Sequence, residues 1–387
     1  MAKETVLTKS KVENPGQIRD RFQQFSEAQL GSSQPRLEEQ ERFNRQGWER
    51  CAEFGVMALP ADPAFGGDGA SMHQVIEAFE GLGYGCRDNG LLLAISAHLW
   101  GCLLPVGAFG STRLKERFLP MLAAGRFIGG LAVSEPEAGS DAFSLAATAR
   151  RDGDRYVLDG VKTFVTNGTV ADLVVVLARC GQDEGLGALS AFLVEKDSPG
   201  FRVEKKLGKM GLRTAEMARI RLAECRVPAS NRIGPEGIGR SLFAHVMEWE
   251  RACIMAPAVG SMQFLLDRTI RYARKRVQFD QPISKQPEVA AKIIQMKLRV
   301  DTSRLLLQNA GQLKEVGRSV LMEASLAKLY VSECWVKNCL DAMAVHGGYG
   351  YLTDFEIEKE LRDAMGSQFY SGTAEIQRLT AARLMGL

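Results

Sequence analysis

The hydrophobic residues of this chain change their spacing twice, and this limits the possible folds more than any other feature. Up to about residue 125 they recur in steps of three to five residues, as on one face of a helix. From 126 to 235 they form short β-branched runs separated by turn residues, and after that the helical spacing returns. Helices, then strands, then helices is not the order of a doubly wound α/β sheet. We therefore predict an α+β fold.

The first part, residues 1–125, is predicted to be an N-terminal helical domain. Residues 1–16 are polar and indicate a loose start, and the helical spacing begins at about Pro35. A stretch rich in Pro and Gly, 59–71, predicts a loop. Ser71 closes that loop and is placed to cap the helix that follows.

The second part, residues 126–235, contains seven short segments with strand character and turn signals between them. Parallel neighbours would need helical crossovers, and no helical pattern in this part is long enough to provide them. We predict an antiparallel β-barrel or sandwich.

The third part, residues 236–387, is predicted to be a C-terminal four-helix bundle. Its apolar residues return to amphipathic helical spacing in long runs. These runs cover 240–275, 286–315, 318–346 and 354–366.

Charge and cysteine usage exclude several functions. Lys and Arg number 49 against 46 Asp and Glu, a net charge of +3, which is too small an excess for a nucleic-acid partner. The chain begins without an apolar signal region, and no uninterrupted apolar run reaches about 18 residues. We expect a cytoplasmic protein that does not span a membrane. The eight Cys form no CxxC and the four His no HxxxH, so no metal site is predicted, and reduced, buried thiols are.

The common nucleotide-binding loops are absent. GIGRSL and GYGYLT lack the third Gly of GxGxxG and the preceding strand, and neither GxxxxGK[ST] nor GxSxG occurs. Phosphates, if bound, are not bound by a Rossmann or Walker loop.

Four segments in register resemble the acyl-CoA dehydrogenase family of flavoproteins. They are LAVSEPEAGSDAFSLAATARRDGDRYVLDGVKTFVTNG (131–168), RKRVQFDQPISKQPEVAAKIIQMK (274–297), AVHGGYGYLTDFEIEKELRDA (344–364) and GTAEIQRL (372–379). The resemblance covers the chain from about residue 35 and agrees with the helix–strand–helix order. It implies FAD as cofactor and α,β-dehydrogenation of an acyl thioester.

The resemblance also assigns cofactor contacts. Taken alone, several of them have a plainer interpretation: a tight turn for the Gly pair, barrel core for Phe164 and a solvated charge for Arg276. By motif position, Leu131, Val133 and Ser134 face the flavin ring, with Phe164 and Thr166 on its other side. Arg276, Gln278 and Phe279 reach the FAD of a neighbouring subunit, and the remaining FAD contacts are Ala344, Val345, Gly347, Gly348, Thr373 and Glu375.

The position of the catalytic base departs from most of the family. Most members carry a Glu just before the terminal GT motif, where this chain has Ser371. The resemblance to isovaleryl-CoA dehydrogenase-like members instead implies Glu250, which directly precedes Arg251 in HVMEWERAC. A structural role for Glu250 is the alternative, and Glu248, two residues earlier, points to a different face of the helix. We predict that Glu250 removes the α proton.

The resemblance implies further partners. A small Ser371 leaves room for a branched or cyclic acyl group, and its backbone N–H is expected to bind the thioester carbonyl. The substrate is an acyl-CoA or an acyl or aminoacyl carrier protein, as in natural-product prolyl dehydrogenases. The electron acceptor is an electron-transfer flavoprotein or oxygen, and the assembly a homotetramer. A flavin monooxygenase and a silent scaffold are the alternatives. The remaining expected substrate contacts are Ser140, Met247, Arg251 and Gly372.

Overall fold

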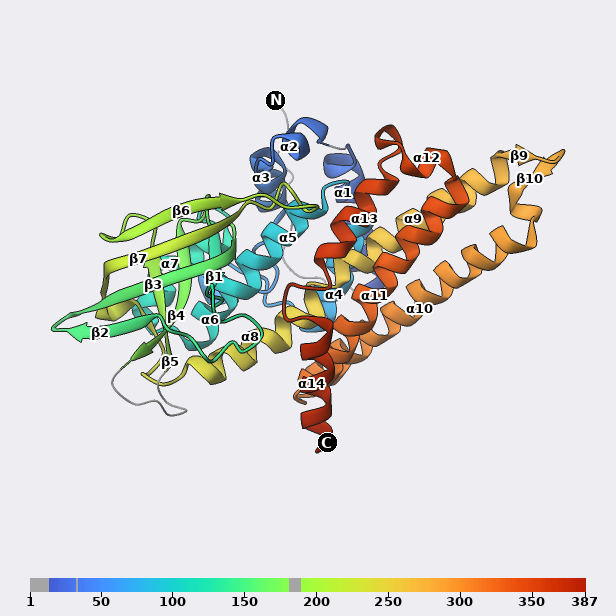
Figure 1. Cartoon of the computed structure of the whole chain (residues 1–387). Coiled ribbons are helices and arrows are strands. Elements are labelled where there is room, and N and C mark those ends of the chain that lie inside the picture. The colour runs from blue at the N-terminus through green and yellow to red at the C-terminus, as the bar shows by residue number, and fades with distance from the viewer. Residues whose placement is uncertain (1–13, 33, 181–188) are drawn as a thin grey trace, which may run out of the picture.

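A computed structural model describes residues 14–32, 34–180 and 189–387. A sheet lies at one end of the molecule, the long C-terminal helices at the other, and the N-terminal helices between and behind them (Figure 1). The confirmed order is helices, sheet, helices. The N-terminal helices are α1 Pro15–Leu30, α2 Pro35–Glu39, α3 Arg45–Phe54, α4 Met72–Gly85, α5 Asn89–His98, α6 Leu104–Phe109 and α7 Thr112–Ala123.

The beginning of the helical region differs from the prediction. Residues 1–13 of the expected loose start lie outside the described residues, but α1 already begins at Pro15 rather than after residue 35. Asn14 caps it in a reciprocal hydrogen-bond pair with Gln17, and Pro15 suits the first helical position. Ser71 caps α4 as predicted, again in a reciprocal pair.

The strands described between residues 129 and 233 form one eight-stranded sheet. Most pairs are antiparallel, as predicted, but β1–β4 and β2–β4 are parallel. Two predicted segments, RYVLDG and VKTFVTNG, are a single long strand, β3, and β2 was not anticipated. The strands are β1 Gly129–Ala132, β2 Thr148–Asp152, β3 Arg155–Thr166, β4 Leu173–Cys180, β5 Leu189–Glu195, β6 Phe201–Leu207, β7 Met217–Pro228 and β8 Arg232–Ile233.

Strand β4 joins two hydrophobic cores. Because side chains alternate across a strand, Val174 and Val176 lie in the interior of the sheet domain, while Leu173 and Val175 belong to the core that it shares with the helices. β4 is therefore buried on both faces, and the sheet is held firmly against the helical domain.

The predicted run 240–275 is two helices, broken at Ile254 and Met255. Pro257 lies in the first turn of the second helix, where its missing N–H costs no helical hydrogen bond. One further helix, α14, follows the predicted runs. The C-terminal elements are α8 Gly239–Cys253, α9 Ala256–Lys275, the hairpin β9 Val277–Gln278 and β10 Gln281–Pro282, α10 Pro287–Glu315, α11 Leu321–His346, α12 Gly348–Tyr351, α13 Ile357–Gly366 and α14 Ala374–Met385.

The stretch Asn89–Phe109 joins α5 and α6 through a π-helical turn, Leu99–Leu103. By length and composition alone this stretch could cross a membrane, but most of it is buried inside the fold. It is a core helix, and its Gly101 packs against Leu131 of β1 so closely that a Cβ atom would approach the Leu131 Cβ to 2.7 Å. All eight Cys are buried and unpaired, as predicted.

Candidate active site

Glu250 lies near the end of α8, on a helix face that it shares with Phe243 and Met247. The start of α8 packs tightly on the sheet, since a Cβ atom at Gly239 would meet the Leu189 backbone at 2.8 Å. At the other end, the Ser371 hydroxyl donates a hydrogen bond of 2.5 Å to Oε1 of Glu250. The structure thus brings the two residues of the base prediction together.

The surroundings of Glu250 raise the pKa of its carboxyl. Burial is the main cause, and the Ser371 hydrogen bond and the positive charges of Arg251 and Lys328 oppose it. A carboxylate with a raised pKa holds a proton more readily than a solvated one, which suits a general base.

Glu248, the alternative carboxylate, faces elsewhere. It forms an ion pair of 2.7 Å with Lys314 and accepts a hydrogen bond from the Val320 backbone N–H. These hydrogen bonds outweigh burial and lower the pKa of Glu248. Glu248 therefore ties α8 to the end of α10 and to the residue before α11, and of the two carboxylates only Glu250 meets the turn at Ser371.

Ser371 and Gly372 form a turn between α13 and α14 in which both residues have left-handed backbone angles, φ 57° and 93°. Arg251 Nε lies 3.3 Å from the Ser371 carbonyl oxygen, and Gln377 Nε2 donates to both turn carbonyls at 2.9 Å. Lys328 Nζ donates to the Gly372 carbonyl at 2.7 Å. Three side chains thus direct the two carbonyl groups.

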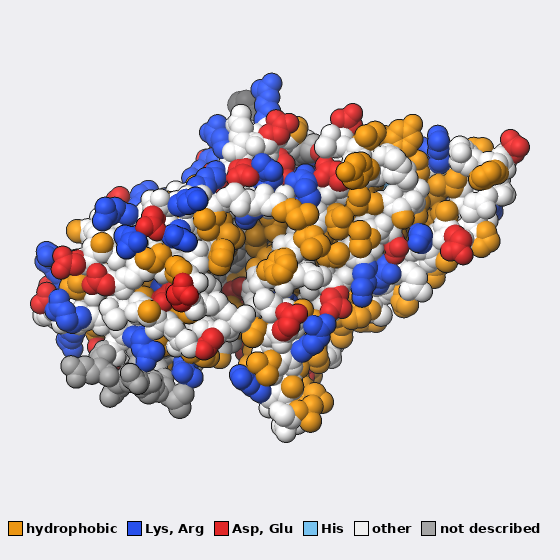
Figure 2. All heavy atoms as spheres, in the orientation of Figure 1, with side chains coloured by type: hydrophobic (Ala, Val, Ile, Leu, Met, Phe, Trp, Pro, Cys, Tyr) orange, Lys and Arg blue, Asp and Glu red, His pale blue; other side chains and the backbone are white. Residues whose placement is uncertain are grey.

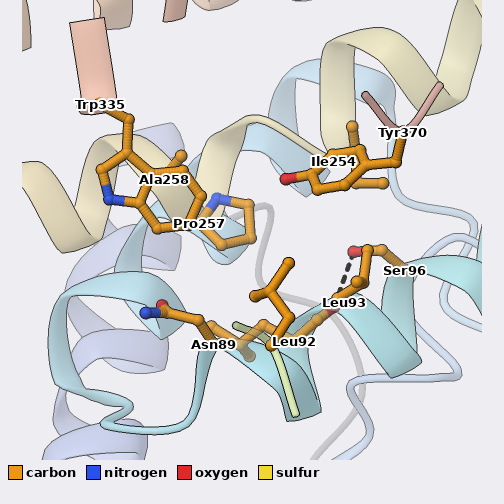
Figure 3. Close-up of a pocket in the computed structure, with 10 residues that line it drawn as sticks. Asn89, Leu92, Leu93, Ser96, Ile254, Pro257, Ala258, Trp335 and Tyr370 are labelled. Atoms are coloured by element: carbon orange, nitrogen blue, oxygen red, sulfur yellow. Dashed lines mark hydrogen bonds between the residues drawn. The ribbon is translucent and has the colours of Figure 1, made fainter. Parts of the chain in front are cut away.

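A small, mainly apolar pocket opens beside this turn (Figure 3). Tyr370 precedes Ser371, and the Ile254 N–H donates to the Glu250 carbonyl one helical turn along the chain. The side chains of Tyr370 and Ile254 both line the pocket. The pocket therefore lies next to the Ser371 turn and to the end of α8, which carries Glu250. The other lining residues are Asn89, Leu92, Leu93, Ser96, Leu212, Pro257, Ala258 and Trp335.

A second group of predicted residues meets at the ends of β1 and β3. The Thr163 N–H donates to the Ser134 carbonyl at 2.9 Å, which joins the two segments. Phe164 occupies a bulge with φ 56° and is 63% exposed. This group, called the sheet-side group below, contains Leu131, Val133, Ser134, Phe164 and Thr166, the residues predicted to lie on the two sides of a flavin ring.

A buried ion pair holds the loop that carries Ser140 next to this group. Lys162 Nζ lies 2.7 Å from Glu135 Oε1, and the Glu135 carboxylate accepts hydrogen bonds from the N–H groups of Ala146 and Ala147. Both ends of the loop are thereby fixed, while Ser140 at its tip is exposed. Burial lowers the pKa of Lys162.

The same loop reaches the Glu250 helix. Phe143 packs edge-on against Phe243 of α8, with ring centroids 5.6 Å apart, and the Arg240 guanidinium lies 4.4 Å from the Phe143 ring centroid. Phe243 and Glu250 are seven residues apart, and therefore on one helix face. The loop that carries Ser140 thus links the sheet-side group to the helix that carries Glu250. Figure 2 shows a hollow with hydrophobic side chains between the sheet and the C-terminal helices.

A third set of predicted cofactor residues lies elsewhere in this chain. Arg276, Gln278 and the 89% exposed Phe279 sit on the β9–β10 hairpin, at the tip of the helices far from the sheet (Figure 1). The ends of α11 and α12 lie near them, since Arg276 stacks over Tyr349 at 5.8 Å. The structure therefore does not bring this set to the sheet within one chain. The remaining members are Ala344, Val345, Gly347 and Gly348.

Two residues predicted to contact a ligand, Met247 for the substrate and Val345 for FAD, have buried side chains. Met247 is 5% exposed and Val345 6%, so their side chains pack into the hydrophobic core. Thr373 caps α14 and Glu375 is exposed in its first turn, next to the Ser371–Gly372 turn.

The sheet-side group suits a flat ring with a polar edge. Phe164 is exposed, and two half-buried hydroxyl residues are near it in the backbone: Thr166 on the same strand, and Ser134, whose carbonyl accepts from Thr163. An apolar face next to hydroxyl and backbone groups matches the chemistry of an isoalloxazine, which is flat and carries hydrogen-bonding atoms at its edge. The residues present fit FAD.

Lys328, Gln377 and Tyr370 were missed by sequence reasoning. Lys328 interrupts the apolar run LAKLYV of α11 and is fully buried. A lysine on the apolar face of a helix is the signal that could have indicated it, because a buried ammonium needs a specific partner.

Replacing Ser371 by Ala is expected to shift the acid limb of the rate profile to higher pH. The Ser371 hydrogen bond lowers the pKa of Glu250, so losing it leaves that pKa higher still. The base is active when ionised, and a higher pKa means that ionisation is complete only at higher pH. Turnover rates of both proteins between pH 5 and 9, at saturating substrate, measure the shift; an acid limb at unchanged or lower pH would contradict it.

The chain matches sequence profiles of all three domains of one family. They are the acyl-CoA dehydrogenase N-terminal domain over residues 13–126, the middle domain over 130–225 and the C-terminal domain over 237–386.

Similar proteins point the same way. The L-prolyl-[peptidyl-carrier protein] dehydrogenase of Pseudomonas fluorescens is 39% identical over 346 residues, 89% of this chain and 91% of that protein. The crystal structure of the prolyl acyl carrier protein oxidase AnaB superposes with a TM-score of 0.95 at 46% identity, covering 98% of this chain and all of that one. PigA with FAD and proline gives a TM-score of 0.94 at 33% identity over 98% and 100%. The chain belongs to the acyl-CoA dehydrogenase family.

Proposed function

We propose that this protein is an FAD-dependent dehydrogenase that introduces an α,β double bond into an acyl thioester, with Glu250 as the base. The observation that carries the proposal is the Glu250 carboxyl, which has a raised pKa and accepts a hydrogen bond from Ser371, the residue at the family's usual base position. A silent scaffold would have no need of a carboxylate with a raised pKa there, and a monooxygenase would not need a base over the α carbon.

The chain's own residues hold the thioester and move one proton. Glu250 takes the α proton of the acyl group, and its half-buried carboxyl, with its raised pKa, suits that role. The Ser371 N–H is available to donate to the thioester carbonyl, where negative charge develops as the proton leaves. FAD, when bound, accepts the β hydrogen as hydride. Leu131, Ser134, Phe164 and Thr166 would hold its ring.

A carrier-protein thioester of a cyclic aminoacyl group is the substrate that we favour over a CoA thioester. Similar proteins are named as acting on prolyl carrier proteins. The small Ser371 side chain fills less space beside Glu250 than the Glu at the family's usual base position would, which favours a compact ring over a long chain. An electron-transfer flavoprotein or oxygen would reoxidise the enzyme.

The function is tested by anaerobic mixing of the FAD-loaded protein with a panel of thioesters. The panel contains prolyl and other acyl groups, each on a carrier protein and on CoA. We expect the yellow flavin absorbance to bleach fastest with the prolyl carrier protein. Bleaching by no thioester would refute the dehydrogenase, and faster bleaching by prolyl-CoA would refute the carrier preference.

Replacing Arg276 by Ala is expected to weaken FAD binding about tenfold or more, since guanidinium–phosphate hydrogen bonds are charge-assisted and bidentate. Arg276 lies at the hairpin, far from the sheet of its own chain, so we propose that it contacts the FAD of a neighbouring subunit in a homotetramer. Exposed apolar residues of α10 and α14 offer contact surface for such an assembly: Ile294, Leu298, Leu305, Leu384 and Met385.

The measurements are flavin content after gel filtration and the oligomeric state by light scattering. Lys275→Ala, at the adjacent position, is the matched control. Full FAD retention in the Arg276 variant would contradict the assignment, and so would a monomer that keeps its FAD.

A further inference from the structure

Lys328 is a buried cation that has no role in the chemistry proposed above. It lies in the middle of α11 with no exposed surface, and its Nζ hydrogen bonds across to the Gly372 carbonyl at 2.7 Å. Burial and the nearby positive charge of Arg251 lower its pKa to about 8, while Glu375 and Glu250 oppose this shift. Burying an ammonium costs free energy, so a structure that does so uses the position specifically.

The turn that Lys328 holds would not keep its conformation alone. Ser371 has φ 57°, and a left-handed backbone costs a non-glycine residue about 1 kcal/mol or more. Gly372 follows with φ 93°. Arg251 and Gln377 hold the Ser371 carbonyl, and Lys328 holds the Gly372 carbonyl. Because a peptide unit is planar, these contacts fix the two peptide planes that follow Ser371, and so hold the turn that carries the Ser371 N–H from its C-terminal side.

The Ser371–Gly372 turn contacts both the proposed base on α8 and, through Arg251, helix α11. The Ser371 hydroxyl holds Glu250, and Arg251 follows Glu250 directly on α8. Arg251 in turn donates to Ser325, one turn before Lys328 on α11, at 2.9 Å. The base, the turn and α11 are thus joined through two cations, Arg251 and Lys328.

We propose that Lys328 is a positioning residue for the proton-transfer step. Through the Gly372 carbonyl it holds the Ser371–Gly372 turn so that Glu250 and the Ser371 N–H face the same thioester. The α C–H bond breaks, the proton moves to the Glu250 carboxylate, and the electron pair of that bond is delocalised onto the thioester oxygen. The positive charge of Lys328 behind the turn stabilises that oxygen. This inference rests on the proposed function.

The test isolates proton transfer from oxidation. Acetyl-pantetheine has α hydrogens but no β carbon, so it cannot be dehydrogenated, and its α hydrogens exchange with D2O only if a base removes them. The FAD-loaded wild type, Lys328→Met and Lys337→Met are compared by proton NMR. Lys337 is an exposed lysine on the same helix, so its variant is the matched control.

We expect Lys328→Met to slow exchange, and the bleaching of FAD by the best panel substrate, at least about tenfold. The fall should appear in kcat more than in KM, with FAD content unchanged, and Lys337→Met should match the wild type. Exchange and bleaching at the wild-type rate in Lys328→Met would overturn the inference.

A second pair of variants covers the case in which Lys328→Met does not fold. If Lys328→Met does not fold, Lys328→Arg and Lys328→Gln are compared, because both keep a donor and only Arg keeps the charge. Faster exchange or bleaching in the Arg variant supports the inference, and equal or slower rates overturn it. A wild type that neither exchanges nor bleaches with any thioester would instead refute the proposed function itself.

Discussion

Replacing Glu250 by Gln is expected to leave FAD bound and to lower the rate of flavin reduction by about 10³-fold or more. A general base contributes up to about 10⁴-fold, and the amide cannot accept the α proton. Gln is nearly isosteric and can still accept the Ser371 hydrogen bond, so the pocket and the turn should keep their shape. Stopped-flow absorbance with the best panel substrate measures the rate, and visible absorbance measures the FAD content.

Glu248→Gln is the matched control for this experiment. It makes the same change two residues away on the same helix, but it weakens the ion pair with Lys314 rather than the active site. We expect it to lower the melting temperature and to leave the reduction rate within about threefold. Near-normal turnover in the Glu250 variant, or a larger loss in the Glu248 variant, would show that the base is elsewhere.

Replacing Ser371 by Glu is expected to lower turnover of a cyclic or branched substrate about 100-fold. The Ser371 hydroxyl lies 2.5 Å from Glu250 Oε1, so the new carboxylate would stand beside the old one. Two carboxylates this close cannot both ionise readily, and the larger side chain fills space beside Tyr370. Activity should survive, if at all, only on slim acyl chains.

The comparison of a cyclic with a straight-chain thioester measures this change in preference. Ser371→Ala serves as the control, because it removes the hydroxyl without adding volume or charge. Improved turnover of the native substrate by the Glu variant would contradict both the pocket and the assignment of the base to position 250.

The sequence predicted the order of the secondary structure because local patterns determine it. The change of apolar spacing located the sheet, and Ser71 identified the start of α4. It missed α1, whose signal is an Asn–Pro pair in a polar stretch. The parallel pairing of β1 with β4 could not be predicted, because strands so far apart in the sequence pair through tertiary packing rather than local pattern.

For the candidate site, the sequence indicated the motif residues but not the side chains that hold them in place. Motif positions implied that Glu250 and Ser371 belong to one site and that residues near β1 and β3 contact one flavin ring. In the structure Glu250 meets Ser371, and the Ser134 and Thr163 backbones are hydrogen-bonded. They could not indicate that Lys328 and Gln377 hold the Ser371–Gly372 turn, because such contacts depend on the packing of α11 and α14 against it. Nor could they show that the side chains of Met247 and Val345 are buried.

A crystal structure of the FAD-loaded Glu250→Gln variant with its acyl thioester tests the central claim most directly. The account predicts the acyl α carbon between the flavin ring and the side chain at position 250, within about 4 Å of that side chain, as a base in proton-transfer reach requires. A side chain at position 250 that points away from the thioester, or a flavin bound away from β1 and β3, would contradict it.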